Sequence, residues 1–445
     1  MKSKKIEHII NEIIDQYCYA DSTEKPWIIG FSGGKDSTVM LTLVWEALLQ
    51  IRKMPTPFQL KRPVYVVCND TLVENPIIVE YVNRILNKIS VAAREQDLPI
   101  FVRKTIPRLE DSFWVNIIGK GYPVPNNAFR WCTDKLKIKP TSRFISEQVA
   151  ENGEAIILIG TRSSESATRA KSIKKHEIKG KRLTKHPNQS NTFVYAPIRH
   201  LMLEEIWSII NSYPSPWGAD NSELFKIYAD ASADDYECPT LVTNKEHSSC
   251  GQSRFGCWTC TVVKEDKSMS ALINNGFDWL KPLLDLRNSL DSERNDIEIR
   301  MPTRRDGTRA VNDMGTYQTL YRANILRRVL EAQKKIQLSK PHVELITNQE
   351  LIAIQVIWNR DLFFEKKVSE IYNEVFNITL DMKGKAERQE KENKLLLEAC
   401  ENNEVEFNLI QDFLQLQKSK TLMIRKRGLQ ADIENRLERF IKDKN

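Results

Sequence analysis

The sequence lacks several features that would place it in special classes of protein. No apolar run approaches the ~20 residues that a membrane-spanning helix needs. The N-terminus carries basic residues but no continuous apolar core, and its isoleucines between residues 6 and 14 repeat at helical spacing, which predicts an amphipathic helix instead of a signal peptide. There is no internal repeat and no low-complexity tract. We therefore expect a soluble cytoplasmic protein with no membrane contact.

The composition is that of a globular protein with more than one domain. The 445 residues suffice for two or three domains, and 41% of them are hydrophobic and 28% charged. Of the eight cysteines, Cys18, Cys68 and Cys400 lie in strand or helix patterns and are expected in the core. In a cytosolic chain the others are more often metal-binding or catalytic than disulfide-bonded.

The first 200 residues alternate strand and helix patterns. Five strands are predicted within residues 26–32, 63–70, 100–106, 154–162 and 192–200, with helices between them. This order predicts an α/β fold with a parallel sheet and right-handed crossovers, whose ligands bind at the carboxyl ends of the strands. We expect three parts: this domain at 1–212, a cysteine-rich segment at 213–268 and a charged helical region at 269–445.

A glycine-containing loop, SGGKDST at residues 32–38, follows the first strand. It is not a Walker A loop, which requires G-x-x-x-x-G-K-[ST]. The glycines let the backbone approach a phosphate, and the next helix offers free N–H groups and the positive end of its dipole. An ordinary glycine turn before a capped helix is the alternative. The phosphate-binding set predicted here is Ser32, Gly33, Gly34, Lys35, Asp36, Ser37 and Thr38.

Four cysteines are spaced as metal ligands. The pattern C-x11-C-x6-C-x2-C places Cys238, Cys250, Cys257 and Cys260 within one irregular segment. Four thiols with a chelating C-x2-C pair suit tetrahedral sulfur ligation, and the spacing does not separate Zn²⁺ from a 4Fe–4S cluster.

A basic segment lies between residues 162 and 185. Its cationic residues, against only Glu165 and Glu177, are Arg162, Arg169, Lys171, Lys174, Lys175, Lys179, Lys181, Arg182 and Lys185. With a net charge of +7, the chain permits a polyanionic partner. The segment is either a solvated surface loop or a surface that attracts nucleic acid.

The SGGKDST loop resembles the PP-loop of the ATP pyrophosphatase group, which includes sulfonucleotide reductases, tRNA thiolases and adenylating amidotransferases. Further stretches at 67–76, 113–138, 159–170, 195–201 and 256–260 resemble the DndC family of DNA phosphorothioation sulfurtransferases, over roughly the first 270 residues. The resemblance implies a Rossmann-like domain of the adenine nucleotide α-hydrolase type, which cleaves ATP between the α and β phosphates. It also implies replacement of a non-bridging phosphate oxygen of DNA by sulfur.

The same resemblance implies cofactors and partners. They are ATP, Mg²⁺ and a 4Fe–4S cluster on the four cysteines, with DNA, a cysteine desulfurase as sulfur donor and the subunits DndD and DndE as partners. A sulfonucleotide reductase is an alternative, although its E-C-G-x-H segment does not occur in this sequence. Two further alternatives are a tRNA thiolase and a scaffold subunit that binds ATP and DNA without turnover.

Catalytic roles are expected for Lys35, Asp36, Arg162 and Cys132. Cys132 is the candidate sulfur carrier, because Arg130 and Lys135 beside it favour a thiolate; a buried structural cysteine is the alternative. Three further assignments rest on the strand ends. Asp70 binds ribose, adenine or Mg²⁺, or else caps the helix near Pro76. Arg162 holds the ATP α-phosphate or the DNA phosphate, with Arg169 in a similar role and Glu165 completing the nucleotide site.

Overall fold

The computed structural model describes most of the chain. The described residues are 4–19, 25–54, 60, 62–176, 180–230, 256–361, 363, 365–378, 394–400, 403, 405–411 and 413–414, without the side chains of 167–169, 172, 229 and 230. Cys238 and Cys250 lie outside this range, as does Lys179. No helix in the described ranges is long and apolar enough to cross a membrane.

The chain divides into two compact units. One comprises Met1–Pro107 and Val124–Glu293, and the other Arg108–Pro123 and Arg294–Asn445. The second unit therefore takes a short piece of chain from within the first 200 residues. The three-part division at residues 212 and 268 stays a prediction.

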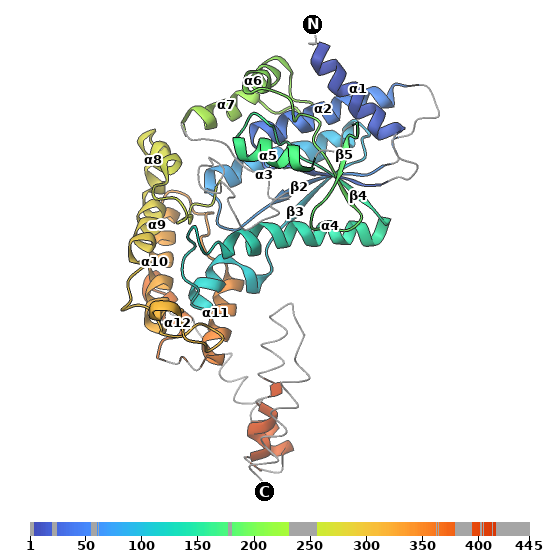
Figure 1. Ribbon diagram of the computed structural model, residues 1–445. Coiled ribbons are helices and arrows are strands. Elements are labelled where there is room, and N and C mark those ends of the chain that lie inside the picture. The colour runs from blue at the N-terminus through green and yellow to red at the C-terminus, as the bar shows by residue number, and fades with distance from the viewer. Residues whose placement is uncertain are drawn as a thin grey trace. The chain divides into compact units, whose positions relative to one another are not determined.

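The first unit is built on a six-stranded sheet in the order β3-β2-β1-β4-β6-β5 (Figure 1). The strands are β1 (Trp27–Gly30), β2 (Val64–Asn69), β3 (Ile100–Thr105), β4 (Ala155–Leu158), β5 (Leu183–Lys185) and β6 (Thr192–Tyr195). The five predicted strands pair in parallel, which confirms the predicted α/β fold. The short β5 runs antiparallel to β6 at the edge and was not predicted, because three residues in a basic segment carry no strand pattern.

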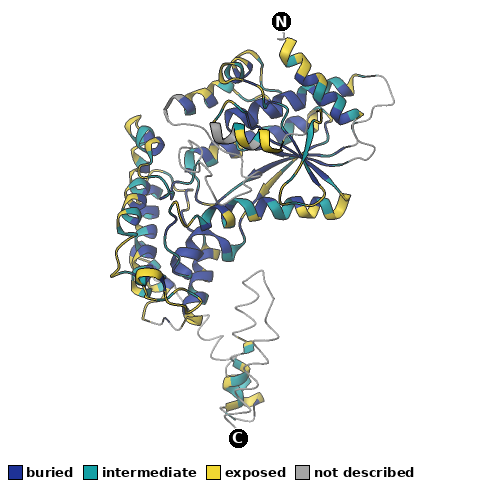
Figure 2. Cartoon of the chain, viewed as in Figure 1, coloured by how far each residue is buried: buried dark blue, intermediate teal, exposed yellow. Residues whose placement is uncertain are grey.

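The two faces of the sheet are covered by different helices (Figures 1 and 2). Trp27 and Ile29 of β1 belong to the larger core, with α1 (Lys4–Cys18), α2 (Lys35–Arg52), α3 (Pro76–Glu95), α6 (Leu203–Ser212) and α7 (Asn221–Asp230). Ile28 and Ile157 point to the opposite face, where they pack with Ile145 of α4 (Lys139–Asn152). Successive strand residues alternate between faces, so one buried strand feeds both cores.

The remaining elements of the first unit lie between its strands or after the C-x2-C turn. They are the π-helix η3 (Thr133–Ile138), α5 (Ala167–His176), α8 (Lys267–Asn274), the 3₁₀ turn η5 (Asp278–Leu280) and α9 (Lys281–Glu293). Asp266 caps α8 by accepting the N–H of Met269 at 2.9 Å.

The second unit is helical, as predicted for the C-terminal region. Its elements are η1 (Leu109–Asp111), η2 (Val115–Gly119), η6 (Val311–Asp313), α10 (Thr319–Gln337), α11 (Asn348–Arg360) and α12 (Val368–Phe376). Two buried indoles fasten the inserted piece: Trp114 donates to Leu345 O at 2.7 Å, and Trp358 donates to Ile118 O at 2.8 Å. Each indole buries a large apolar surface and keeps its N–H satisfied.

Candidate functional site

The loop after β1 has a backbone conformation that only glycine adopts without strain. Gly33 has φ +78°, and a Cβ there would lie 2.8 Å from Cγ2 of Val82 on α3. Ahead of it, the Phe31 N–H still pairs with Val67 O at 2.9 Å, so the loop leaves the sheet in a fixed direction. The geometry is a close approach of the loop backbone to α3. The approach of this backbone to a phosphate, which the two glycines indicated, stays a prediction.

The hydroxyl groups of the loop bind one another and the backbone. Ser32 Oγ and Ser37 Oγ lie 3.1 Å apart, and Ser37 Oγ donates to Gly34 O at 3.0 Å. The Gly34 N–H reaches Ser32 Oγ at 3.4 Å, whereas the cap residue of α2, Gly34, has no side chain to cap the helix. These hydroxyls therefore stiffen the loop, and the head of α2 is left to other acceptors.

A group of buried charges lies under the loop. Lys35 Nζ is 3.3 Å from Asp36 Oδ2, and Arg162 Nε is 2.5 Å from Asp36 Oδ1. The Lys35 and Arg162 side chains are each only 2% exposed. Gly160 makes this approach possible, because a Cβ there would lie 3.1 Å from the backbone carbonyl of Asp36. The structure thus brings together three of the four predicted catalytic residues, with Arg162 engaged by Asp36.

Glu165 lies at the carboxyl end of β4 and closes the turn that begins at Arg162. Its Oε2 accepts the Arg162 N–H at 3.1 Å, and its own N–H donates to Arg162 O at 3.3 Å. Beside this turn, the buried hydroxyl of Thr161 has no hydrogen-bond partner in the described part of the chain. An orphaned buried hydroxyl next to a phosphate-type loop is a group that a bound nucleotide would satisfy. Thr161 was not predicted as a site residue, because a threonine in the stretch Gly-Thr-Arg matches no nucleotide-binding pattern.

Asp70 lies at the end of β2, but it does not cap a helix. Its Oδ1 accepts the Leu72 N–H at 2.9 Å, and Lys104 Nζ is 3.9 Å from Oδ2. The cap of α3 is Asn75, whose side chain accepts the Ile77 N–H at 3.0 Å. The helix-cap alternative for Asp70 is therefore wrong, because Asn75 stands directly before Pro76 and Asp70 lies a full loop earlier. The ligand role of Asp70 stays a prediction.

The C-x2-C turn lies against this same loop after β2. Cys257 forms a β-bridge with Glu74, and the Trp258 N–H donates to Val73 O at 3.0 Å. Cys257 Sγ lies 3.4 Å from Thr71 Oγ1, and the Cys260 N–H donates to Cys257 O at 3.1 Å. Two of the four predicted metal ligands are thus held on one turn at the carboxyl edge of the sheet.

Arg287 of α9 clamps the chain that follows this turn. Its guanidinium is buried, and it donates to Cys260 O at 2.8 Å, to Lys264 O at 3.0 Å and to Val263 O. The five N–H donors of a guanidinium have fixed directions, which suits several backbone carbonyl groups that point toward it. Within the described ranges, no three histidine, cysteine or acidic side chains gather as a metal site. With Cys238 and Cys250 outside those ranges, the four-cysteine site stays a prediction.

Cys132, the candidate sulfur carrier, is half-buried in the helical residues 131–132 that lead into η3. The η3 helix is fixed to the end of β2, because the Asn69 amide donates to Leu136 O at 3.0 Å. The chain before it is fixed to the cysteine segment by a 2.6 Å hydrogen bond from Thr261 Oγ1 to Pro125 O. The segments that carry Cys132 and Cys257 are therefore both anchored around the β2 edge. Arg130 reaches Asn127 Oδ1 at 2.7 Å.

Glu74 is a titratable residue of this region that the sequence did not reveal. Desolvation of its half-buried carboxyl, reinforced by the nearby Asp70, raises its pKa to about 7, although Lys137 opposes the shift. A carboxyl that changes charge near neutrality lies beside the C-x2-C turn.

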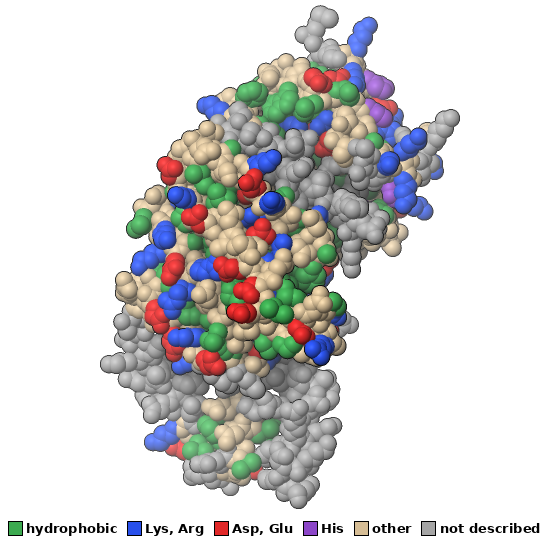
Figure 3. Space-filling view, turned by 60° about the vertical axis from the view of Figure 1, so that its left-hand side comes forward, with side chains coloured by type: hydrophobic (Ala, Val, Ile, Leu, Met, Phe, Trp, Pro, Cys, Tyr) green, Lys and Arg blue, Asp and Glu red, His purple; other side chains and the backbone are tan. Residues whose placement is uncertain are grey.

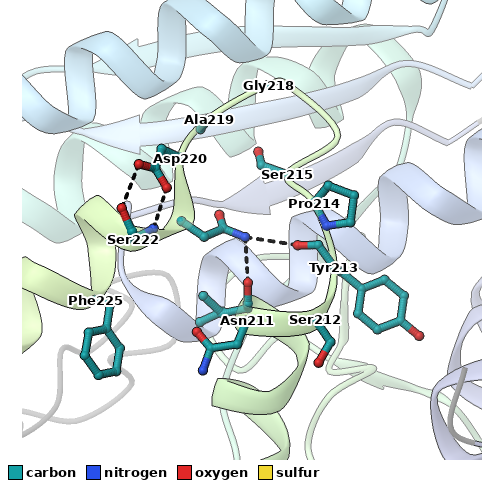
Figure 4. Close-up of a pocket in the computed structure, with 12 residues that line it drawn as sticks. Asn211, Ser212, Tyr213, Pro214, Ser215, Gly218, Ala219, Asp220, Ser222 and Phe225 are labelled. Carbon is teal, nitrogen blue, oxygen red and sulfur yellow. Dashed lines mark hydrogen bonds between the residues drawn. The ribbon is translucent and has the colours of Figure 1, made fainter. Parts of the chain in front are cut away.

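A groove of about 880 Å³ lies elsewhere in the first unit, along the connection between α6 and α7 (Figure 4). The Asn221 amide donates to Ile210 O at 2.7 Å and to Tyr213 O at 3.1 Å, while Asp220 binds Ser222. These polar groups close their own loop, so the groove offers few free contacts to a ligand. Phe225 of α7 forms part of its wall.

Comparisons with known proteins agree with the sheet and the loop. The model of the phosphoadenosine phosphosulfate reductase domain family matches residues 26–263. An uncharacterized protein of Methanocaldococcus jannaschii is 26% identical over 197 residues, 44% of this chain and 34% of that protein. The chain thus spans about a third of that relative's length.

Two solved structures align with this chain at low TM-scores. The phosphoadenylyl-sulfate reductase from Candida auris, in a phosphate complex, aligns over 54% of this chain and 96% of its own, with 12% identity and a TM-score of 0.31. The U34-tRNA thiolase NcsA from Methanococcus maripaludis, with its 4Fe–4S cluster, aligns over 71% and 89%, with 13% identity and a TM-score of 0.30.

The close approach at Gly33 predicts a stability difference between two alanine substitutions. Gly33 and Gly153 share φ +78°, but a Cβ at Gly153 would meet nothing within 4 Å. Gly153→Ala should lose about 1–3 kcal/mol, because φ +78° with ψ −41° is a sparsely populated conformation for alanine. Gly33→Ala should lose about 1–3 kcal/mol more from overpacking. Urea unfolding followed by circular dichroism measures both. Adding Val82→Ala should recover part of the Gly33→Ala loss; equal losses for the two glycines would contradict the described contact.

The buried ion pair predicts strong coupling between its two residues. Asp36→Asn should reduce stability by about 3–5 kcal/mol, because it takes the anion away from two buried cations, Lys35 and Arg162. Arg162→Met should cost less, because Lys35 Nζ remains 3.3 Å from Asp36 Oδ2. The double variant should lose much less than the sum, with a coupling of about 1–3 kcal/mol. The control is the exposed pair of Arg309 and Asp313, 3.0 Å apart, whose coupling should stay under ~0.5 kcal/mol. Comparable coupling in both cycles would show that burial does not strengthen the Asp36–Arg162 pair.

Proposed function

The chain belongs to the phosphoadenosine phosphosulfate reductase domain family, and on this premise we propose that it is an ATP-dependent sulfurtransferase acting on DNA. It adenylates a backbone phosphate and then replaces a non-bridging oxygen of that phosphate by sulfur. The observation that carries the proposal is the SGGKDST loop, which heads α2 between the carboxyl ends of β1 and β4 with Gly33 at φ +78°.

The loop suits the pyrophosphate part of a nucleotide. Gly33 and Gly160 leave no room for side chains, α2 supplies the positive end of an 18-residue helix, and the Thr161 hydroxyl is available. The Walker pattern, which serves γ-phosphoryl transfer, is absent from this stretch. We therefore infer that ATP is cleaved between its α and β phosphates.

In the first step a DNA phosphate oxygen attacks the α-phosphorus of ATP as the bond to pyrophosphate breaks. The product is a mixed anhydride in which AMP is a good leaving group. Lys35 stabilises charge that develops on the phosphates, and acidic residues such as Asp70 would hold Mg²⁺ there. Because Arg162 binds Asp36 at 2.5 Å, its first role is to position the loop. Arg162 can contact a phosphate directly only if its guanidinium binds Asp36 and the phosphate at the same time.

In the second step a persulfide on Cys132 supplies the sulfur. Its terminal sulfur bonds to the DNA phosphorus while the bond from phosphorus to the AMP oxygen breaks. A thiol reductant then attacks the Cys132 sulfur, which releases the phosphorothioate and leaves a disulfide for further reductant to reopen. A cysteine desulfurase regenerates the persulfide. Cys132 suits this role because it is half-buried and not sealed in the core.

The cysteine-rich segment is proposed to hold a 4Fe–4S cluster through Cys238, Cys250, Cys257 and Cys260. The C-x2-C turn fits, since both thiols lie on one turn and Thr71 offers a hydroxyl to Cys257 at 3.4 Å. When bound, the cluster would fix this segment at the sheet edge or handle sulfur. The subunits DndD and DndE are the proposed further partners.

DNA is favoured as the acceptor by the charge distribution. On α5, Lys171, Lys174 and Lys175 are exposed at i, i+3 and i+4 spacing, directly after the proposed nucleotide edge. Two arginines of the 300–309 loop are instead paired: Arg305 lies 3.0 Å from Asp361, and Arg309 binds Asp313. On the face of the helical region shown in Figure 3, acidic and basic side chains are interspersed. A tRNA acceptor and a sulfonucleotide substrate are the outcomes that the test distinguishes.

The products of ATP and the fate of DNA test the proposal. With ATP, DNA, the desulfurase and the partner subunits, the protein should release AMP and pyrophosphate, and mass spectrometry of digested DNA should reveal a sulfur-bearing dinucleotide. Lys35→Met should abolish both, whereas Lys53→Met, at the far end of α2, should abolish neither. Release of ADP and orthophosphate would overturn the nucleotide assignment. Sulfur in tRNA alone, or sulfite from a sulfonucleotide, would overturn the acceptor.

The α5 surface predicts a salt-dependent contact with DNA. Each phosphate contact contributes ~0.9 to the slope of log affinity against log salt. Changing Lys171, Lys174 and Lys175 to Ser should lower that slope by ~2–3 and weaken binding to all DNA sequences alike. ATP affinity should stay unchanged. Fluorescence anisotropy at several salt concentrations measures the slope.

The control for this experiment removes the same charge elsewhere. Lys53, Lys335 and Lys366 are exposed and scattered, so their replacement by Ser should leave the slope nearly intact. Arg182 is left out of both variants, because it binds Glu12 at 3.2 Å and Asp15 of α1 and so has a structural role. An equal change in both triple variants would show that DNA does not bind at α5.

A further inference from the structure

Tyr228 of α7 lies directly against the SGGKDST loop. Its hydroxyl accepts the backbone N–H of Lys35 at 3.2 Å, and the Lys35 ammonium lies 5.2 Å from the centre of its ring. The Tyr228 side chain is buried, with 8% of the residue exposed. One tyrosine from a distant part of the chain therefore contacts both the main chain and the side chain of the lysine in the loop.

The N–H that Tyr228 occupies is one that a phosphate would use. Lys35 is the first residue of α2, and the N–H groups of a first helical turn have no acceptor within their own helix. Such groups bind anions, and here the cap residue Gly34 supplies no side-chain acceptor. The Tyr228 oxygen thus takes a position at which an oxygen of a bound anion would accept the same hydrogen.

The helix that carries Tyr228 is held by few buried side chains. Among the described side chains of α7, only Leu224 and Tyr228 are buried. Phe225 is 50% exposed beside the groove of Figure 4. Trp207 of α6 contacts both aromatic residues edge-on, with ring centres 5.6 Å from Phe225 and 5.2 Å from Tyr228. Displacing Tyr228 therefore takes one buried side chain of α7 out of the larger core, and Trp207 would sense it.

We propose that Tyr228 is a built-in competitor of the nucleotide. In the empty protein its hydroxyl satisfies the Lys35 N–H and its ring holds the Lys35 ammonium. The pyrophosphate part of the nucleotide takes over both contacts, and Tyr228 moves away from the loop. This inference rests on the proposed nucleotide binding at SGGKDST, and it adds that binding at this loop is opposed by a contact within the chain.

Removing only the hydroxyl tests the competition. Tyr228→Phe leaves the Lys35 N–H without its acceptor in the empty protein, so inorganic pyrophosphate should bind about two- to tenfold more tightly, the equivalent of one net hydrogen bond. The matched control is Tyr195→Phe on β6, whose hydroxyl has no hydrogen-bond partner within the described ranges. Its pyrophosphate affinity should equal that of the wild type. Isothermal titration calorimetry with pyrophosphate alone measures all three proteins.

Trp207 gives a second readout that leaves Tyr228 intact. Pyrophosphate should change the tryptophan emission of the wild type, and Trp207→Phe should remove that change without removing binding. Equal or weaker pyrophosphate binding by Tyr228→Phe, or an emission change that survives Trp207→Phe, would overturn the inference and leave the proposed function standing. If neither the wild type nor Tyr228→Phe binds pyrophosphate, the loop is not an anion site and the proposed function falls with the inference.

Discussion

The buried ion pair of Asp36 and Arg162 is the contact on which the geometry of the loop depends. It joins the first turn of α2 to the end of β4, two elements separated by more than 100 residues of chain. Neither charge would be stable alone at this depth, because an unpaired buried ion loses its hydration without compensation. The pair forms because Gly160 lets the strand end approach the helix within contact distance. Once it is formed, Lys35 and the loop backbone have a fixed frame.

A second group of contacts organises the neighbouring strand end around β2. The loop after β2 carries Asp70 and pairs with Cys257, while Asn69 holds the helix that follows Cys132. The ends of β2 and β4 lie at the same edge of a parallel sheet, so the proposed nucleotide site and the proposed sulfur-transfer residues would share that edge. Arg287 keeps the C-x2-C turn in place from α9 by satisfying carbonyl groups that no regular element covers.

The sequence predicted local features well and long-range partners poorly. The five parallel strands followed from apolar runs, and the loop from two glycines between strand and helix. The partner of Arg162, the approach of Tyr228 and the clamp of Arg287 could not be predicted, since each joins residues far apart along the chain and none has a periodic signal. Asp70 was a plausible helix cap by residue type, but Asn75 occupies the position before Pro76 that defines the cap.

The basic segment shows why a count of charges is a weak guide to a binding surface. Its described side chains have different environments: Arg162 is buried on Asp36, and Arg182 is bound to Glu12 and Asp15 of α1. The lysines of α5 are exposed, as are Lys181 and Lys185. Charges that already neutralise acidic groups in the fold release few counterions when DNA approaches. The exposed lysines retain that capacity, both those on α5 and Lys181 and Lys185 after it. The segment that looked uniformly suited to nucleic acid therefore contains residues with different tasks. Arg162 supports the loop, Arg182 joins the segment to α1, and exposed lysines form a cationic face next to the proposed nucleotide edge.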